Sequence, residues 1–209
     1  MICLFDNDII SKLAFCDLFD DALTTLGAKR DEVFVLPTAR FVLLKPIKHP
    51  EVAKERLGEA AYDRVRTFLE SVGVLDTPPP TEEFQIFDDL VGIDSGEAIL
   101  FSATAQFPQF VLATGDKRSL RALYAEPKCK LICDRLAGKV VCFEQVVRLI
   151  IDQVDFASVL KKLVPARGCD TALRAVFGSG LDATERNVKD GLASYIAELR
   201  NLTGGLLMA

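Results

Sequence analysis

Short, unbroken apolar runs alternate along this chain with longer stretches in which apolar residues recur at helical spacing. An apolar run of about five residues, bounded by polar residues, proline or glycine, is typical of a β-strand that is buried on both faces. Strands of this kind that alternate with helices form a parallel sheet with helices packed on it. The sequence therefore predicts a three-layer α/β fold with a mostly parallel central sheet, whose strands are residues 1–5, 33–37, 110–114 and 139–143.

Helices are predicted between and after these strands. In the first part of the chain they span 11–26, 38–44, 50–72, 84–91, 95–106, 117–124 and 144–151, with a stiff proline-rich loop over 75–83. Later in the chain the pattern is wholly helical, with helices over 157–163, 169–177 and 187–202. We therefore expect an α/β domain over residues 1–154. We expect residues 155–209 to be a helical extension that packs on that domain or on a partner, such as a second copy of the chain.

Composition and charge exclude several classes of protein. The 209 residues carry a net charge of −5, whereas strong non-specific binders of duplex nucleic acid are usually basic. A single histidine, His49, leaves little for an imidazole zinc site or a Ser-His-Asp triad. The six cysteines form no CxxC pair and several stand inside apolar runs, which predicts free thiols in a reducing cytoplasm. We find no signal-peptide pattern and no apolar run of membrane-spanning length, so we expect no membrane association.

Acidic residues stand at the ends of two predicted strands and at the start of one helix. Asp6 and Asp8 follow the first strand, and Asp116 follows the strand over 110–114. Asp94 and Glu97 stand at the start of the predicted helix 95–106. Ligands of an open parallel sheet bind beyond the carboxyl ends of its strands, so we expect these side chains in one cleft. Carboxylates suit Mg²⁺ or Mn²⁺, which activate water and neutralise phosphate charge. A purely structural alternative is that Asp94 and Glu97 form a capping box.

Three segments resemble the PIN domain family, over roughly residues 1–150. They are CLFDNDII at the start, GEAILFSATAQFPQFVLATGDKRSLRAL further on, and KVVCFEQVVRL. The resemblance implies a PIN-type α/β fold that hydrolyses RNA, here expected to be single-stranded, with Mg²⁺ or Mn²⁺ on clustered carboxylates. It makes Asp6, Glu97 and Asp116 the catalytic and metal-binding acids, with Asp8 as a further oxygen ligand. Many small members of the family are toxins paired with an antitoxin.

One acidic position of that family is missing from this chain. The family usually carries a glutamate in the helix after the second strand. The count from Pro37 lands near Leu43, in a segment that holds no carboxylate. Asp8, Asp94 or Glu51 could replace the missing acid. The departure leaves a second interpretation open, in which the fold has lost catalysis and serves as a binding or regulatory module.

A third interpretation is a different class of enzyme. A strand-end Asp-x-Asp also occurs in haloacid dehalogenase-like phosphatases, in which Asp6 would be the nucleophile. The Gly-Thr that normally follows that motif is replaced here by two isoleucines.

The charges around Asp116 give two further expectations. Lys117, Arg118 and Arg121 follow it directly, and they either contact a nucleic-acid backbone or lie on a solvated helix face. Carboxylates that crowd together repel one another, so we expect Asp116→Asn to stabilise the metal-free protein slightly.

Overall fold

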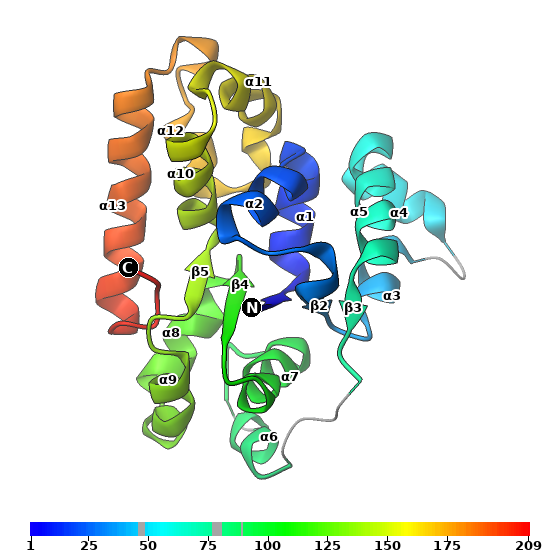
Figure 1. Cartoon of the computed structure of the whole chain (residues 1–209), viewed down its shortest axis with the longest axis vertical. Coiled ribbons are helices and arrows are strands. Elements are labelled where there is room, and N and C mark those ends of the chain that lie inside the picture. The colour runs from blue at the N-terminus through cyan, green and yellow to red at the C-terminus, as the bar shows by residue number, and fades with distance from the viewer. Residues whose placement is uncertain (46–48, 77–80, 89) are drawn as a thin grey trace.

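The central sheet is entirely parallel. The computed structural model of the chain describes residues 1–45, 49–76, 81–88 and 90–209 (Figure 1). Within them, five strands form one sheet in the order β3-β2-β1-β4-β5. The strands are β1 (Ile2–Phe5), β2 (Val33–Val35), β3 (Gly73–Val74), β4 (Phe110–Thr114) and β5 (Val140–Cys142). The predicted α/β class is therefore confirmed.

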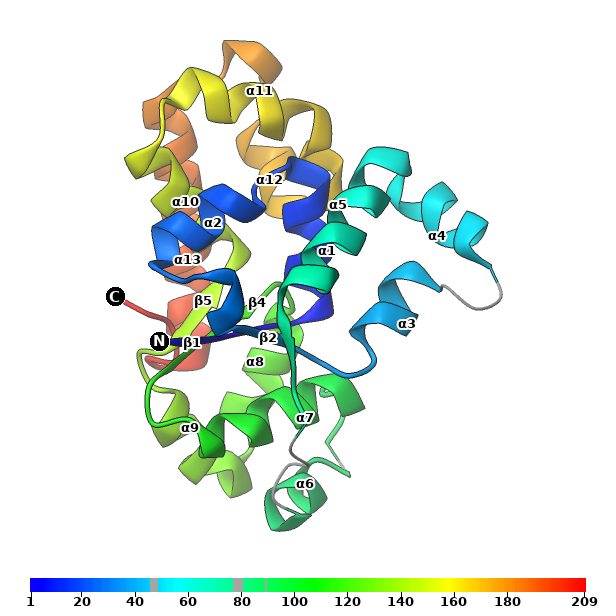
Figure 2. The ribbon, with the colours of Figure 1, turned by 45° about the vertical axis from the view of Figure 1, so that its right-hand side comes forward.

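Helices cover both faces of this sheet. They are α1 (Asn7–Cys16), α2 (Phe19–Leu26), α3 (Ala39–Leu44), α4 (Pro50–Leu57), α5 (Glu59–Ser71), α6 (Thr81–Phe87), α7 (Ser95–Ala103), α8 (Lys117–Ala125), α9 (Lys130–Leu136), α10 (Phe143–Gln153), α11 (Phe156–Ala166), α12 (Thr171–Val176) and α13 (Glu185–Thr203). In Figure 2 the sheet is seen nearly edge-on, with α1, α2 and α5 above it and α6, α7 and α9 below it. The arrangement is the three-layer one that the sequence predicts.

The strand order reverses between β1 and β4. From β1 the chain adds β2 and β3 on one side, and it later adds β4 and β5 on the other side. The two strands pair in register, with Leu4 opposite Leu112 and Phe5 opposite Ala113. The segments that leave their carboxyl ends diverge onto different helices, and such a reversal point is where open parallel sheets bind ligands.

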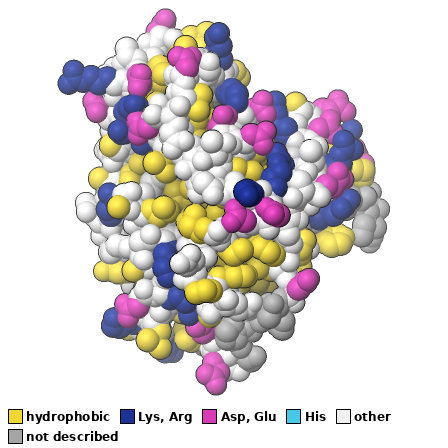
Figure 3. Space-filling view, viewed as in Figure 1, with side chains coloured by type: hydrophobic (Ala, Val, Ile, Leu, Met, Phe, Trp, Pro, Cys, Tyr) yellow, Lys and Arg dark blue, Asp and Glu magenta, His cyan; other side chains and the backbone are white. Residues whose placement is uncertain are grey.

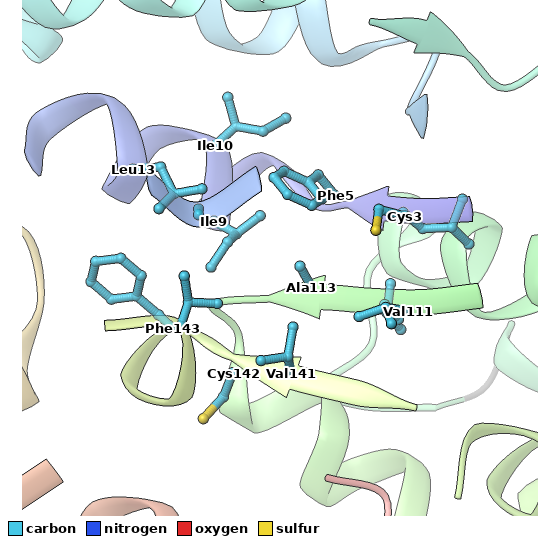
Figure 4. Packing of buried hydrophobic residues seen from close by; sticks show 14 of the residues in the cluster. Cys3, Phe5, Ile9, Ile10, Leu13, Val111, Ala113, Val141, Cys142 and Phe143 are labelled. Carbon is cyan, nitrogen blue, oxygen red and sulfur yellow. The ribbon is translucent and has the colours of Figure 1, made fainter. Parts of the chain in front are cut away.

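Helix α1 is anchored to the sheet by apolar side chains. Figure 4 shows Ile9 and Leu13 pointing toward Ala113 of β4, Val141 of β5 and Phe143 at the start of α10. All five are buried. The i, i+4 spacing of Ile9 and Leu13 puts them on one face of the helix. This packing fixes the position of the strand end from which α1 starts.

Two helices that the sequence predicts as single are each broken in two. The predicted helix 11–26 begins earlier, at Asn7, and is divided at Asp17, whose φ of 54° is left-handed. Arg64 holds that corner, because it pairs with Asp17 at 2.8 Å and donates to the Ala14 carbonyl at 3.1 Å. The predicted helix 50–72 is divided at Gly58, whose φ of 77° suits glycine.

Three further elements differ from the prediction. Strand β3 was not predicted, since its two residues directly follow the predicted helix 50–72. It pairs with β2, and a Cβ on Gly73 would lie 2.8 Å from the Phe34 ring, so glycine is needed for the close approach. Helix α6 begins inside the predicted loop 75–83, of which residues 77–80 lie outside the described residues. Helix α9 was not predicted, and its apolar face is short.

The helices after residue 154 pack on the rest of the chain. Helix α13 lies against α8 and α10, and α11 lies against α1. The end of the chain reaches the sheet edge, where Leu207 bridges to Val140 of β5. This contact covers an edge that would otherwise be open to pairing. None of the described helices is long and apolar enough to cross a membrane.

Candidate functional site

The five acidic residues at the strand ends and at the start of α7 line one cavity. It has a volume of about 370 Å³ and is bounded by Asp6, Asp8, Asp94, Glu97 and Asp116, together with polar and apolar residues of α1, α3, α7 and the segment between β2 and α3. The cavity lies at the carboxyl ends of β1 and β4, where the strand order reverses. The fold therefore brings together three segments that are remote in sequence.

Asp6 is the most buried of these acids. It is the residue before α1, and its Oδ1 accepts a hydrogen bond from the Ile9 amide at 2.5 Å. Its Oδ2 accepts from the Thr114 hydroxyl and, at 3.1 Å, from the Gly115 amide. Burial raises the pKa of Asp6 to about 6, although the bonds from Thr114 and Ile9 oppose that rise. Asp6 thus joins the ends of β1 and β4.

Asp94 and Glu97 form the capping box that the spacing allows. The Asp94 Oδ1 accepts from the Glu97 amide at 2.9 Å, and the Glu97 Oε2 accepts from the Asp94 amide at 2.8 Å. Burial raises the pKa of Glu97 to about 8. The amide of Asp94 opposes this rise, whereas the negative charges of Asp116 and Asp94 add to it. The box therefore holds Glu97 inside the cavity at an electrostatic cost.

Asp116 is held in its charged form. Its Oδ1 accepts from the amides of Arg118 at 2.7 Å and Ser119 at 3.3 Å, which caps α8. Its Oδ2 pairs with the Arg118 guanidinium at 2.9 Å. Burial alone would raise the pKa of Asp116, but these partners lower it below its ordinary value. This direction argues against the expectation that Asp116→Asn stabilises the metal-free protein, and it points to Glu97 as the acid whose neutralisation relieves repulsion.

A buried lysine at the edge of the cavity was missed by the sequence analysis. The Lys12 ammonium lies 2.7 Å from Asp8 Oδ2, 2.9 Å from Asp170 Oδ2 and 3.3 Å from the Gly115 carbonyl oxygen. Burial alone would lower the pKa of Lys12, but Asp8 and Asp170 raise it, so the ammonium stays charged. The i, i+4 spacing of Asp8 and Lys12 was visible, yet the helix was predicted to begin only at residue 11.

Two further residues make this arrangement possible. A Cβ on Gly115 would lie 2.1 Å from Asp8 Oδ2, so only glycine lets the Asp8 carboxylate rest against this turn. Asp170 is buried and caps α12, with its Oδ1 accepting from the Ala172 amide at 2.8 Å. The C-terminal helices thus supply one of the two carboxylates that hold Lys12. No local sequence signal links Asp170 to Lys12.

The resemblance predicts an acid near Leu43, and the structure shows where that residue lies. Leu43 is buried in the core and does not face the cavity. The neighbouring Val42 lines the cavity, and its side chain is partly exposed. Glu51, a candidate replacement, lies on α4 with an exposed side chain that contacts His49 at 3.1 Å.

The three basic residues after Asp116 point in different directions. Lys117 pairs with the buried Glu144, and Arg121 lies 3.8 Å from Glu198 of α13. Arg118, at 86% exposure, is the one that pairs with a cavity acid. On the face shown in Figure 3, basic and acidic side chains are interspersed, without a continuous basic strip.

Comparisons of the chain with protein-family models, with curated proteins and with solved structures found no match. The geometry of the site is thus the basis for any functional inference. Among the described residues, no group of three or more histidine, cysteine or acidic side chains is already arranged to hold a metal ion. Asp8 and Asp116 each form an ion pair, with Lys12 and Arg118 respectively. Asp94 and Glu97 each accept a hydrogen bond from the backbone amide of the other.

Proposed function

We propose that this protein is a PIN-type ribonuclease that hydrolyses single-stranded RNA with Mg²⁺ or Mn²⁺. The observation that carries the proposal is the convergence of Asp6, Glu97 and Asp116 on one cavity at the point where the strand order reverses. The resemblance of residues 1–150 to PIN domains supports the same reading. Acidic cavities of this kind bind a hard cation, and the cation in turn recruits a phosphodiester.

The donor set suits such a cation. Every side chain in question offers oxygen, which Mg²⁺ and Mn²⁺ prefer. Asn7 also lines the cavity, and its buried Oδ1 has no hydrogen-bond partner within the part of the chain that the structure describes. Burial, and after it the negative charges of Asp116 and Asp94, raise the pKa of Glu97, and a bound cation would offset both effects. Asp6, Glu97 and Asp116 would hold the cation, with Asp8 and Asp94 as additional ligands.

Each residue then has a distinct part in hydrolysis. A bound cation would lower the pKa of a water ligand and neutralise charge on the phosphodiester. Asp6 keeps one geometry, because both of its oxygens accept hydrogen bonds. Arg118 is exposed next to Asp116 and would bind a phosphate oxygen of the substrate. Lys12 keeps Asp8 turned toward the Gly115 turn.

Cleavage of a fluorogenic single-stranded RNA tests the proposal. We expect cleavage with Mn²⁺ or Mg²⁺, none in EDTA, and a loss of about 100-fold or more in Asp116→Asn. Asparagine still caps a helix, so the variant should fold. Glu70→Gln is the control, because it also removes one negative charge but from an exposed position on α5. This variant should cleave RNA like the wild type. Cleavage that survives EDTA, or that Asp116→Asn leaves unchanged, would place the chemistry elsewhere.

One observation favours a second candidate, a non-catalytic binding module. Lys12 forms an ion pair with Asp8, and Arg118 forms one with Asp116. These two cations neutralise part of the negative charge of the cavity, as a bound metal ion would otherwise do. Titration calorimetry separates the two. The nuclease proposal requires heat on addition of Mn²⁺ that Asp6→Asn removes, whereas the binding module gives no heat in either protein.

We also place the protein in the cytoplasm. All six cysteines are free thiols. Thiols of this number persist in a reducing compartment.

A further inference from the structure

Two cysteines that are far apart in sequence lie side by side. The Sγ atoms of Cys16, at the end of α1, and Cys169, in the short 3-10 helix Arg167–Cys169, are 3.8 Å apart. The other cysteines are placed differently. Cys3, Cys129 and Cys142 are buried, and the half-buried Cys133 donates to the Leu123 carbonyl oxygen.

The accessibility of the two thiols is unequal. Cys16 is 1% exposed, whereas Cys169 is half-buried and therefore the more accessible of the two. Either sulfur can donate the hydrogen bond between them. With Cys16 as the donor, the bond lowers the pKa of Cys169 and raises the pKa of Cys16. The accessible sulfur is thus the one that favours the thiolate, the reactive form of a cysteine.

We propose that Cys16 and Cys169 are a site of reversible oxidation, at which a peroxide converts the two thiols into a disulfide that ties α1 to the C-terminal helices. The site is independent of the proposed nuclease activity. A protein in a reducing compartment holds these thiols reduced at rest, and disulfides found there are usually transient.

The chemistry balances with hydrogen peroxide as the oxidant. The Cys169 thiolate attacks one peroxide oxygen, the O–O bond breaks, and the hydroxide that leaves takes up a proton to form water. Cys169 is then a sulfenic acid. The Cys16 sulfur attacks the Cys169 sulfur, the S–O bond breaks, and the departing hydroxide takes the Cys16 proton. The two sulfurs are oxidised, the peroxide is reduced to two waters, and a small thiol reverses the reaction by exchange.

The position of the pair gives the disulfide a structural effect. Cys16 lies one turn beyond Lys12 on α1, and Cys169 directly precedes Asp170, which pairs with Lys12 at 2.9 Å. The thiol pair and the ion pair therefore join the same two segments. A bond between them would close a long loop of the chain, and long loops give disulfides a large stabilising effect.

The test uses the full chain treated with hydrogen peroxide. We expect the count of titratable thiols to fall by two from six. Peptide mapping without reductant should find Cys16 linked to Cys169, and dithiothreitol should restore both thiols. The midpoint of thermal unfolding should rise by about 5 °C or more. Cys133→Ser should behave in the same way, because Cys133 lies outside the pair.

A second variant tests the order of the steps. In Cys16→Ser, Cys169 has no partner thiol, so its sulfenic acid should accumulate and be trapped by dimedone. A linkage between other cysteines would overturn the proposal. It would equally be overturned if six thiols remained after treatment, or if wild-type Cys169 passed to the sulfinic acid without a cross-link.

Discussion

Glu97→Gln should change how the stability of the metal-free protein depends on pH. Burial and the charges of Asp116 and Asp94 raise the pKa of Glu97 from 4.5 to about 8 in the folded protein. The folded state therefore holds this proton more tightly than the unfolded state. The stability that comes from the protonated form is complete below pH 4.5 and is lost as the pH rises through about 8.

The size of the effect follows from the two pKa values. A shift from 4.5 to about 8 corresponds to about 5 kcal/mol in the absence of screening, since each pH unit is worth about 1.4 kcal/mol. Glu97 is only partly buried, so solvent screens its charge, and we expect about 2 kcal/mol. For a chain of this length that is a shift of about 4–8 °C in the midpoint of thermal unfolding.

Thermal unfolding of both proteins at several pH values between 5 and 9, in EDTA, measures this effect. The two midpoints should agree near pH 5, and Glu97→Gln should be the more stable above pH 8. Glu70→Gln is the matched control, since it removes the same charge from an exposed position on α5. Added Mn²⁺ should narrow the gap at high pH by stabilising the wild type. Parallel profiles for wild type and Glu97→Gln would refute the reasoning about this site.

Two other predictions concern Lys12 and the helix α3. Lys12→Met should destabilise the protein by about 3 kcal/mol, because the buried Asp170 loses its partner. Adding Asp170→Asn to Lys12→Met should recover part of the lost free energy of unfolding, measured by chemical denaturation. If the effects of the two substitutions simply add, the two side chains are not coupled. Val42→Glu should strengthen Mn²⁺ binding about tenfold by calorimetry, since Val42 lines the cavity. Leu43→Glu, in the core, should instead cost about 3 kcal/mol of stability without raising the affinity.

Several elements of this fold can be predicted from short stretches of the sequence. The residues of β1, and those of β4 up to Thr114, are apolar without interruption, as is typical of a strand buried on both faces, and both strands were predicted. Once these strands are placed, Asp6 and Asp116 are placed at their carboxyl ends. The capping box at α7 was also readable, because Asp94 and Glu97 stand at the required spacing within four residues.

Elements that depend on distant partners were not readable. The apolar spacing of 11–26 continues across Asp17, and what stops the helix there is a left-handed turn held by Arg64 from α5. Strand β3 has two residues, too few for a pattern, and it exists because Gly73 fits against Phe34 of β2.

The details of the site were decided by tertiary structure. One residue along a helix turns a side chain by about 100°, so counting alone could not separate Val42 at the cavity from Leu43 in the core. The pairing of Lys12 with Asp170 joins residues from α1 and from the C-terminal helices. Sequence patterns record which side chains must be buried or must end an element. They do not record which element lies opposite, because that depends on how the layers pack once the whole sheet has formed.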